Sequence, residues 1–276
     1  MSFDELARFP RGAEWIARAP RLAAECADRW SLELGEPYAY ANVSLVFPAG
    51  DVVLKVSFPH WESEHEAAAL RHWDGDGAIR LVDYDAERNA LLLERCVPGT
   101  SLLELPEEEG FREAARVLPN LWSRPARPGD PFTPIAETAA RWKLELPERW
   151  EAAGRPFERG LLDEAVAALR EFPPTQSQLV VCHQDFHRGN VLSSRRGWLA
   201  IDPKPVVAEP AFDTAALIRD GPGDPRRRLE YLSAELGLDR ERMRGWAIAH
   251  AIAWGFAEHE PAVHEGHIEV ARALRR

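Results

Sequence analysis

One stretch of this chain constrains its fold more than any other, namely Val181-Cys-His-Gln-Asp-Phe-His-Arg-Gly-Asn190 with Ile201-Asp-Pro-Lys204 shortly after it. It begins as a short apolar strand, passes through a polar loop, and continues into two apolar segments on either side of Arg195-Arg196-Gly197. Three residues that include a left-handed glycine commonly join two antiparallel strands. The stretch therefore predicts a strand, a loop and a hairpin, and pairing centred on residue 196 places residue 190 opposite residue 202.

Two carboxylates and an amide oxygen converge at the open end of this predicted hairpin. Asn190 and Asp202 emerge there side by side, and Asp185 lies in the loop that leads into it. Hard oxygen ligands of this kind suit Mg²⁺. Phosphoryl transfer needs a metal that neutralises phosphate charge and a separate carboxylate that receives the proton of the attacking hydroxyl. We therefore interpret Asp185 as the base, and Asn190 and Asp202 as metal ligands, although each of them singly is typical of a turn, a cap or a strand edge.

The pattern His183-x-Asp185-x-x-x-x-Asn190, followed by Asp202, resembles the catalytic loop and metal motif of the aminoglycoside phosphotransferase superfamily, which is related to the protein kinases. Within that superfamily, residues 200–213 are most similar to the streptomycin 6-phosphotransferases and the aminoglycoside/hydroxyurea antibiotic-resistance kinases. The resemblance covers about residues 38 to 220. It implies an α+β fold with two lobes, protein-kinase-like, in which a small antiparallel sheet forms the N-terminal lobe and helices form most of a larger C-terminal lobe.

The pattern of apolar residues agrees with that organisation. Strand-like segments separated by turns dominate the first part of the chain, and helical spacing dominates after Pro98-Gly99. We expect an N-terminal lobe over residues 1–96, with a helical extension broken at Pro10 and Pro20 and a nucleotide-binding sheet. Residues 97–276 are expected to form the helical C-terminal lobe, with the catalytic loop and the acceptor site.

Lys55 lies in a strand between apolar neighbours, where an unpaired ammonium is unfavourable. The resemblance implies that this lysine holds the phosphates of ATP. Its expected partner is Glu66, which shares a helix face with apolar residues, and Glu62 on the same face is the alternative. The resemblance also implies that Glu94 to Cys96 form the hinge, whose backbone groups bind adenine.

The expected nucleotide loop, Tyr40-Ala-Asn-Val-Ser44, contains no glycine. It therefore lacks the flexible Gly-rich turn that cradles phosphates in protein kinases, and Asn42 and Ser44 are the side chains that could replace it. A second departure concerns Pro205 and Ala208, where the streptomycin-kinase branch is expected to have glycine. Both positions border the acceptor side, so the resemblance leaves the exact substrate open.

Two further residues are expected to support the catalytic loop. The resemblance implies that His183 and Asp213 surround it and that Asp213 braces it, and Asp213 also stands where it could cap the next helix. Recognition of a cationic acceptor requires carboxylates. The candidates in the C-terminal half are Glu209, Asp220, Glu258 and Glu260.

The formal net charge of −11 argues against nucleic acids and anionic membranes as partners, because both are polyanions. It suits a small substrate that is cationic or neutral. Cys26, Cys96 and Cys182 have no metal-ligand spacing, which is typical of a reducing cytosol. The N-terminus does not resemble a signal peptide, and no apolar run approaches the ~20 residues of a membrane span. We therefore expect a cytoplasmic protein that is a monomer or a weak homodimer.

Together these features predict a kinase that uses ATP and Mg²⁺ to phosphorylate a small hydroxyl-bearing molecule. By resemblance, the acceptor is a streptomycin-like aminoglycoside phosphorylated at its 6-hydroxyl, in resistance or self-resistance. Hydroxyurea, another antibiotic or an ordinary metabolite are alternatives. The glycine-free loop also leaves open a pseudokinase, against which the intact Lys55, Asp185, Asn190 and Asp202 argue. The spacing of four residues near the C-terminus matches no zinc motif and indicates a solvated helix end or the rim of the acceptor pocket; they are His259, Glu260, His264 and His267.

Overall fold

The computed structural model describes residues 6–7, 9–39, 43–60, 63–176, 178–256 and 262–275. By its internal contacts the chain divides into two compact units. The first unit consists of Met1–Thr100 and Leu192–Ile201, and the second unit of Ser101–Val191 and Asp202–Arg276. The chain therefore crosses from one unit to the other three times, and the first unit is built from two separate stretches of sequence.

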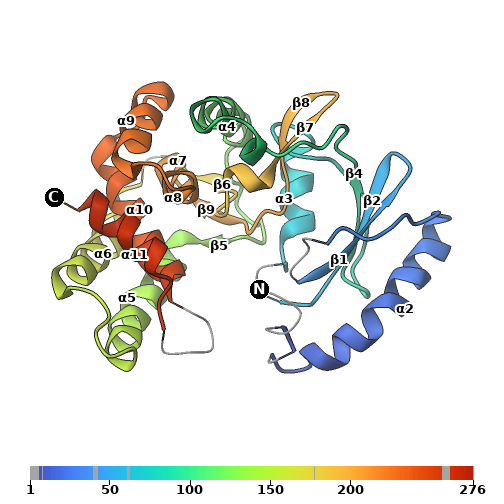
Figure 1. The fold of residues 1–276 in the computed structure, drawn as a ribbon, viewed down its shortest axis with the longest axis horizontal. Coiled ribbons are helices and arrows are strands. Elements are labelled where there is room, and N and C mark those ends of the chain that lie inside the picture. The colour runs from blue at the N-terminus through green and yellow to red at the C-terminus, as the bar shows by residue number, and fades with distance from the viewer. Residues whose placement is uncertain are drawn as a thin grey trace. The chain divides into compact units, whose positions relative to one another are not determined.

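A four-stranded antiparallel sheet forms the centre of the first unit, with strand order β1-β2-β4-β3 (Figure 1). The predicted hairpin around Gly50 is confirmed, since β1 pairs with β2 on either side of it. Leu54 and Val56 of β2 are completely buried in the core of this unit. The elements are β1 Ser44–Ala49, β2 Val52–Ser57, α3 Glu66–Trp73, β3 Leu81–Asp85 and β4 Ala90–Glu94.

Helix α2, Gly12–Trp30, runs through Pro20 without a break, so the predicted interruption at this residue is wrong. A proline inside a helix removes one hydrogen bond and crowds the carbonyl four residues earlier, which costs about 3 kcal/mol. Trp15, Ala19 and Cys26, on both sides of the proline, are buried against the sheet. Most helical stability in proteins comes from packing of an apolar face, and here that packing outweighs the local effect of the proline.

Strands β7, Val191–Ser194, and β8, Gly197–Ala200, form the predicted hairpin. Its turn consists of two residues, Arg195 and Arg196, rather than the three that the sequence predicted. Gly197 has a φ of +99° and begins the second strand, so the glycine serves the left-handed conformation at the edge of the turn and not within it.

The hairpin groups with the first unit, whereas the sequence assigned it to the C-terminal lobe. The Ala200 N–H donates to the carbonyl of Gly77 at 2.8 Å, and the Ala200 carbonyl accepts from the Ile79 N–H at 3.1 Å. Arg196 donates to the Glu94 carboxylate at 2.8 and 2.6 Å. The division of the chain into a nucleotide lobe and an acceptor lobe remains a prediction.

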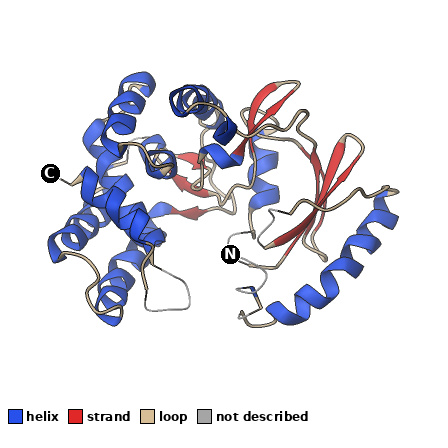
Figure 2. Ribbon diagram, in the orientation of Figure 1, coloured by secondary structure: helices blue, strands red, loops and turns tan. Residues whose placement is uncertain are grey.

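The second unit is mostly helical (Figure 2). Helix α10, Arg240–Gly255, packs against α6, α8 and α11 and is buried along most of its length, as is typical of a helix that is apolar on several faces. The other α-helices that the structure describes in the second unit are α4 Glu107–Leu121, α5 Ile135–Ala152, α6 Arg159–Glu171, α7 Pro210–Asp213, α8 Ala215–Arg219, α9 Pro225–Leu236 and α11 Glu265–Leu274.

A small sheet of order β5-β9-β6 sets the position of the predicted catalytic loop. Strand β6, Val180–Cys182, pairs antiparallel with β9, Val206–Ala208, and β5, Thr133–Pro134, lies parallel to β9 on its other side. The pairing sets Cys182 opposite Val206. The loop that follows β6 and the segment that precedes β9 therefore lie at the same end of the paired strands, which brings residues 183–190 and 202–205 together.

The described helices include none with the length and apolar character that crossing a membrane requires. Cys26 and Cys182 are buried, Cys96 is partly buried, and all three are free thiols. Burial raises the pKa of the Cys182 thiol well above its ordinary value, which disfavours the thiolate that a nucleophile needs.

Candidate active site

The loop after β6 turns sharply at Gln184, which has a φ of +67°. A non-glycine residue in this left-handed region costs about 1 to 3 kcal/mol and persists only where its surroundings hold it. The Gln184 N–H donates to Oδ1 of Asp213 at 2.8 Å. On the other side of the turn, the Asp185 carbonyl accepts from the His187 N–H at 3.0 Å. The backbone on both sides of Asp185 is therefore fixed.

Asp213 is the carboxylate that holds this turn. It is completely buried at the end of α7, where it also accepts a hydrogen bond from Nε1 of Trp122 at 2.9 Å. Burial raises the pKa of Asp213, and the positive charge of His183 and the hydrogen bonds from Trp122 and the Gln184 backbone oppose that rise. Asp213 does not cap α8. Of its two expected roles, the geometry therefore favours bracing of the loop.

The carboxylate of Asp185 lies near a lysine, an arginine and a histidine. Its Oδ2 lies 3.1 Å from Nζ of Lys204, and its Oδ1 lies 3.8 Å from Nη2 of Arg219 and 3.9 Å from Nε2 of His187. The sequence did not indicate that these three side chains gather here. The pairing of β6 with β9 explains why Lys204 lies near Asp185, since it places the residues before Val206 beside the loop. Arg219 comes from α8, and no local pattern reveals its approach.

Asn190 is tied to Asp185 by a hydrogen bond from its Nδ2 to the Asp185 carbonyl, at 3.0 Å. A carbonyl oxygen can only accept, so this contact fixes which end of the amide is the nitrogen. Asp202 is exposed and has a φ of +58°, and the Lys204 N–H two residues later donates to the His183 carbonyl at 3.0 Å. The structure thus joins the segments that carry Asp185, Asn190 and Asp202.

The donor set of Asn190 and Asp202 fits Mg²⁺ better than a transition metal. An amide oxygen and a carboxylate oxygen are hard ligands, and Mg²⁺ usually takes one or two protein oxygens together with phosphates and water. The residues that the structure describes contain no group of three or more His, Cys, Asp and Glu side chains suited to a metal ion. This finding extends to the C-terminal histidines that are described, where Nδ1 of His267 instead hydrogen-bonds the Trp254 carbonyl at 3.0 Å.

In the first unit, Lys55 of β2 pairs with Glu66 of α3, as the sequence predicted. Nζ of Lys55 lies 2.8 Å from each carboxylate oxygen of Glu66, and both residues are buried. The alternative partner, Glu62, lies outside the described residues. A buried, two-pronged ion pair of this kind fixes the height of the ammonium above the sheet.

The other residues predicted to bind nucleotide have varied surroundings. Ser44 is buried and its hydroxyl lies 2.9 Å from the hydroxyl of Ser57, while Asn42 lies outside the described residues. The Glu94 carboxylate is held by Arg196 of the hairpin. Burial raises the pKa of Cys96 to about 11. The predicted role of Glu94 and Cys96 concerns their backbone groups, and it stays a prediction.

The carboxylates predicted to recognise a cationic substrate are engaged inside the protein where the structure describes them. Glu209 is buried and accepts from Nε of Arg242 at 2.8 and 2.7 Å and from Nε1 of Trp246 at 2.6 Å. Asp220 accepts from both the backbone N–H and Nε of Arg188, at 2.8 and 3.0 Å. Glu258 and Glu260 lie outside the described residues.

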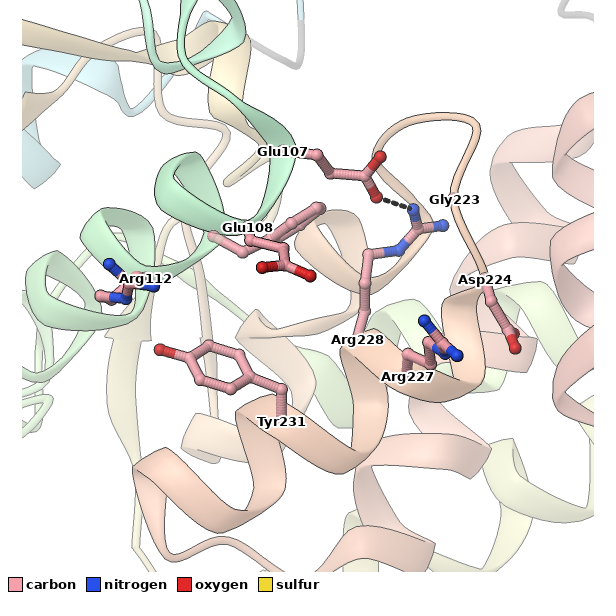
Figure 3. Close-up of a pocket in the computed structure, with 9 residues that line it drawn as sticks. Glu107, Glu108, Arg112, Gly223, Asp224, Arg227, Arg228 and Tyr231 are labelled. Carbon is pink, nitrogen blue, oxygen red and sulfur yellow. Dashed lines mark hydrogen bonds and ion pairs between the residues drawn. The ribbon is translucent and has the colours of Figure 1, made fainter.

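A pocket of about 480 Å³ lies elsewhere in the second unit, where α4 faces the loop before α9 and the start of α9 (Figure 3). Its wall contains the ion pair of Glu107 and Arg228, whose atoms Oε1 and Nη1 are 3.2 Å apart. Phe111 lies against Arg188 of the predicted catalytic loop, with the guanidinium 4.7 Å from the ring centroid. The described residues that line this pocket include none of the predicted site residues.

Two sequence comparisons agree with each other. The family model described as aminoglycoside/hydroxyurea antibiotic resistance kinase matches residues 40–259. The chain is 35% identical over 279 residues to the hydroxyurea phosphotransferase of Kitasatospora aureofaciens, covering 95% of this chain and 81% of that protein. It is 33% identical over 285 residues to the streptomycin 6-kinase of Streptomyces griseus, covering 96% of this chain and 92% of that protein.

Solved structures show the same fold at lower identity. A choline/ethanolamine kinase family protein from Mesorhizobium loti has a TM-score of 0.62 at 18% identity, covering 99% of this chain and 92% of its own. A thermostable mutant of aminoglycoside phosphotransferase APH(4)-Ia, in a ternary complex with ADP and hygromycin B, has a TM-score of 0.61 at 14% identity. The match covers 91% of this chain and 95% of that protein. These likenesses confirm the predicted kinase-like fold.

Proposed function

This chain belongs to the aminoglycoside/hydroxyurea antibiotic resistance kinases, and we propose on that premise that it transfers the γ-phosphoryl group of ATP to a hydroxyl of a small antibiotic. One observation in the molecule supports the proposal most. Asp185 lies in a loop whose backbone is held on both sides of this residue, and one of its carboxylate oxygens has no hydrogen-bonded partner among the described residues. That is the arrangement a base needs in order to receive a proton.

The proposed reaction follows from the residue types. The acceptor hydroxyl donates its proton to Asp185 while its oxygen forms a bond to the γ-phosphorus of ATP. The bond between that phosphorus and the oxygen of ADP breaks, and its electron pair stays on ADP. Because the transition state is loose, Asp185 contributes mainly by aligning the hydroxyl with the phosphorus. The proton then leaves Asp185 for solvent.

ATP and Mg²⁺ are proposed to be held by residues outside the base. Lys55, fixed by Glu66, supplies a positive charge for the phosphates, and the backbone of Glu94 to Cys96 supplies hydrogen bonds for adenine. Asn190 and Asp202 would hold Mg²⁺, which supplies charge neutralisation at the phosphates when bound. An intact set of these residues makes a kinase the better proposal than a nucleotide-binding pseudokinase.

A streptomycin-like aminoglycoside phosphorylated at its 6-hydroxyl is the first candidate acceptor, on the strength of the streptomycin 6-kinase relatives. Hydroxyurea is the second, and it has a relative of its own and a specific observation in its favour. The described neighbours of the Asp185 carboxylate include the cations Lys204 and Arg219, and the described carboxylates Glu209 and Asp220 are bound to arginines. Such surroundings suit a small neutral acceptor.

We further propose that the protein works in the cytoplasm as a monomer or weak homodimer on a free small molecule. Three free cysteines agree with a reducing compartment.

The decisive experiment measures ADP formation from Mg-ATP with streptomycin, a second aminoglycoside, hydroxyurea and a simple alcohol. Mass spectrometry of the acceptor should show the added phosphate, and ³¹P NMR of a streptomycin product should place it on the 6-hydroxyl. Turnover with streptomycin above hydroxyurea supports the first candidate, and the reverse order supports the second. ATP binding without turnover on any acceptor would instead support a pseudokinase and contradict the proposal.

A further inference from the structure

Trp254, in the last turn of α10, contacts two cations. Nζ of Lys204 lies 4.6 Å from the centroid of the indole ring, and the guanidinium carbon of Arg219 lies 5.2 Å from the same ring. A cation within about 6 Å of an aromatic centroid is attracted by the electrons of the ring. One tryptophan therefore gathers a lysine from the segment before β9 and an arginine from α8.

The two cations meet the two oxygens of Asp185 differently. Lys204 is at hydrogen-bonding distance, with Nζ 3.1 Å from Oδ2. Arg219 and His187 are 3.8 and 3.9 Å from Oδ1, beyond the reach of about 3.2 Å of an N–H···O bond. Within the described residues, Oδ2 is thus engaged and Oδ1 is the oxygen available to an acceptor hydroxyl.

Lys204 is fixed at both ends. Its backbone N–H donates to the His183 carbonyl at 3.0 Å, and its side chain, 18% exposed, ends between Asp185 and the indole ring. A lysine stem has four rotatable bonds and is ordinarily mobile. Anchoring the backbone to the loop and the ammonium to Trp254 removes much of that freedom before substrate arrives.

Arg219 is held by a neutral histidine. Its Nη1 lies 3.4 Å from Nδ1 of His250, and Nε2 of His250 lies 3.2 Å from the Gln184 carbonyl. A carbonyl only accepts and a guanidinium only donates, so Nε2 carries the proton and Nδ1 offers its lone pair. Burial and the charge of Arg219 hold the pKa of His250 well below its ordinary value of 6.5, which preserves this neutral form. His250 also stacks on Trp254, with centroids 4.9 Å apart.

We propose that Lys204, Arg219 and Trp254 form a clamp that positions Asp185, an inference that rests on the proposed role of Asp185 as the base. Lys204 holds Oδ2 and so turns Oδ1 toward the acceptor hydroxyl. Arg219 lies near the other oxygen, Oδ1, and limits rotation of the carboxylate. Trp254 sets the distance of both cations from Asp185. Lys204 acts through Asp185 and is a positioning residue.

The substitution Lys204→Met removes the ammonium and keeps the length of the stem. We expect kcat on the best acceptor to fall roughly 10- to 100-fold, because misplacing a reacting group by about 1 Å has an effect of that order. KM for ATP should change less than about threefold, and Lys204→Arg should recover most of the loss because it restores the charge. Lys143→Met in α5 is the matched control and should keep wild-type kinetics. Wild-type kcat in Lys204→Met would overturn the proposal.

Dependence on Asp185 separates positioning from direct contact with phosphate. In the Asp185→Asn background, Lys204→Met should lower kcat by less than about twofold more, because the group that it positions is already disabled. A second loss as large as the first would show that Lys204 acts on ATP or on the acceptor itself, and the clamp would be wrong.

A third measurement does not use turnover. Urea unfolding of the wild type, Lys204→Met, Asp185→Asn and the double mutant should give a coupling free energy between the two residues that differs from zero. If wild-type protein phosphorylates no acceptor while this coupling is present, the proposed function fails and the contact within the clamp stands. If wild-type protein is active and the coupling is absent, the clamp fails and the proposed function stands.

Discussion

The ammonium of Lys55 lies 2.8 Å from both carboxylate oxygens of Glu66, and the two side chains are only 10% and 2% exposed. The pair joins the middle of the sheet to α3 within the first unit. Removing one partner of a buried ion pair is strongly destabilising, because it leaves the other charge buried without that compensation. Breaking the pair is therefore expected to destabilise the first unit as well as to affect the proposed binding of phosphates.

Replacing Lys55 with alanine should reduce both stability and use of ATP. The carboxylate of Glu66 would be left buried without this partner, and the free energy of unfolding should fall by about 3 kcal/mol or more. KM for ATP should rise. Urea denaturation and initial-rate kinetics measure the two effects, with Lys143→Ala as the control. An unchanged free energy of unfolding together with unchanged ATP kinetics would contradict the proposed role of Lys55.

Asp185→Asn should lower catalysis and leave nucleotide binding nearly intact. Asparagine is close to isosteric and keeps an oxygen for Lys204, so packing survives. Loss of a general base is worth roughly 10²- to 10⁴-fold, and this loss should fall on kcat. ATP affinity, measured by calorimetry, should stay within about threefold. Full activity on the best acceptor would reduce Asp185 to a turn residue.

Asp202→Ala should abolish turnover that depends on Mg²⁺, because the proposed ligand between metal and phosphates is gone. The residue has a φ of +58°, which asparagine tolerates better than alanine. Asp202→Asn therefore separates charge from backbone strain, and it should be as inactive as alanine with a melting temperature nearer to wild type. Turnover with Mg-ATP close to wild type in both variants would remove Asp202 from the metal site.

Arg196→Ala should destabilise the first unit by about 1 to 3 kcal/mol, because it leaves Glu94 without its charged hydrogen bonds and frees the carbonyl of Gly75. Arg195, its neighbour in the same turn, is 77% exposed and makes only a 3.9 Å ion pair with Asp51 among the described contacts. Arg195→Ala should stay within about 0.5 kcal/mol of wild type. Equal effects of the two substitutions, measured by urea denaturation, would contradict the role of Arg196.

The difference between wild type and Arg196→Ala should also depend on pH. Burial raises the pKa of Glu94, but the hydrogen bonds from Arg196 and the Arg80 N–H outweigh it, so the pKa lies below its ordinary value of 4.5. A carboxylate with a lowered pKa stabilises the folded state above its unfolded pKa and loses that contribution as pH falls through the folded pKa. The stability gap should therefore be constant above about pH 5 and shrink below about pH 4. A gap that grows on acidification would exclude this ion pair as its source.

The sequence predicted those features that depend on spacing along the chain. The hairpin on either side of Gly50, the strand before His183 and the partner of Lys55 all follow from periodicity within one or two neighbouring elements. The helix that continues through Pro20 was not predictable, because local propensity says nothing of the packing that overrides it.

Partners far apart in the chain were also beyond prediction. Glu209 and Asp220 read in the sequence as carboxylates available to a cationic ligand, since sequence shows that a side chain is charged but not which arginine it meets. Arg196 read as a turn residue, although its guanidinium reaches a carboxylate on β4. Lys204 and Arg219 beside Asp185 were missed for the same reason, because they come from two other segments of the chain.

The two-part construction of the first unit has a consequence for biosynthesis. Residues 1–100 emerge from the ribosome long before Leu192–Ile201, which carries the bonds from Arg196 to Glu94 and from Ala200 to Gly77. At about 5 to 20 residues per second, the nascent N-terminal segment waits roughly 5 to 20 seconds for its last two strands. During that interval most of the second unit is already being made. The unit that starts the chain therefore cannot finish folding until residue 201 has been made, and its completion coincides with the delivery of Asn190 and Asp202 at the two ends of the same hairpin.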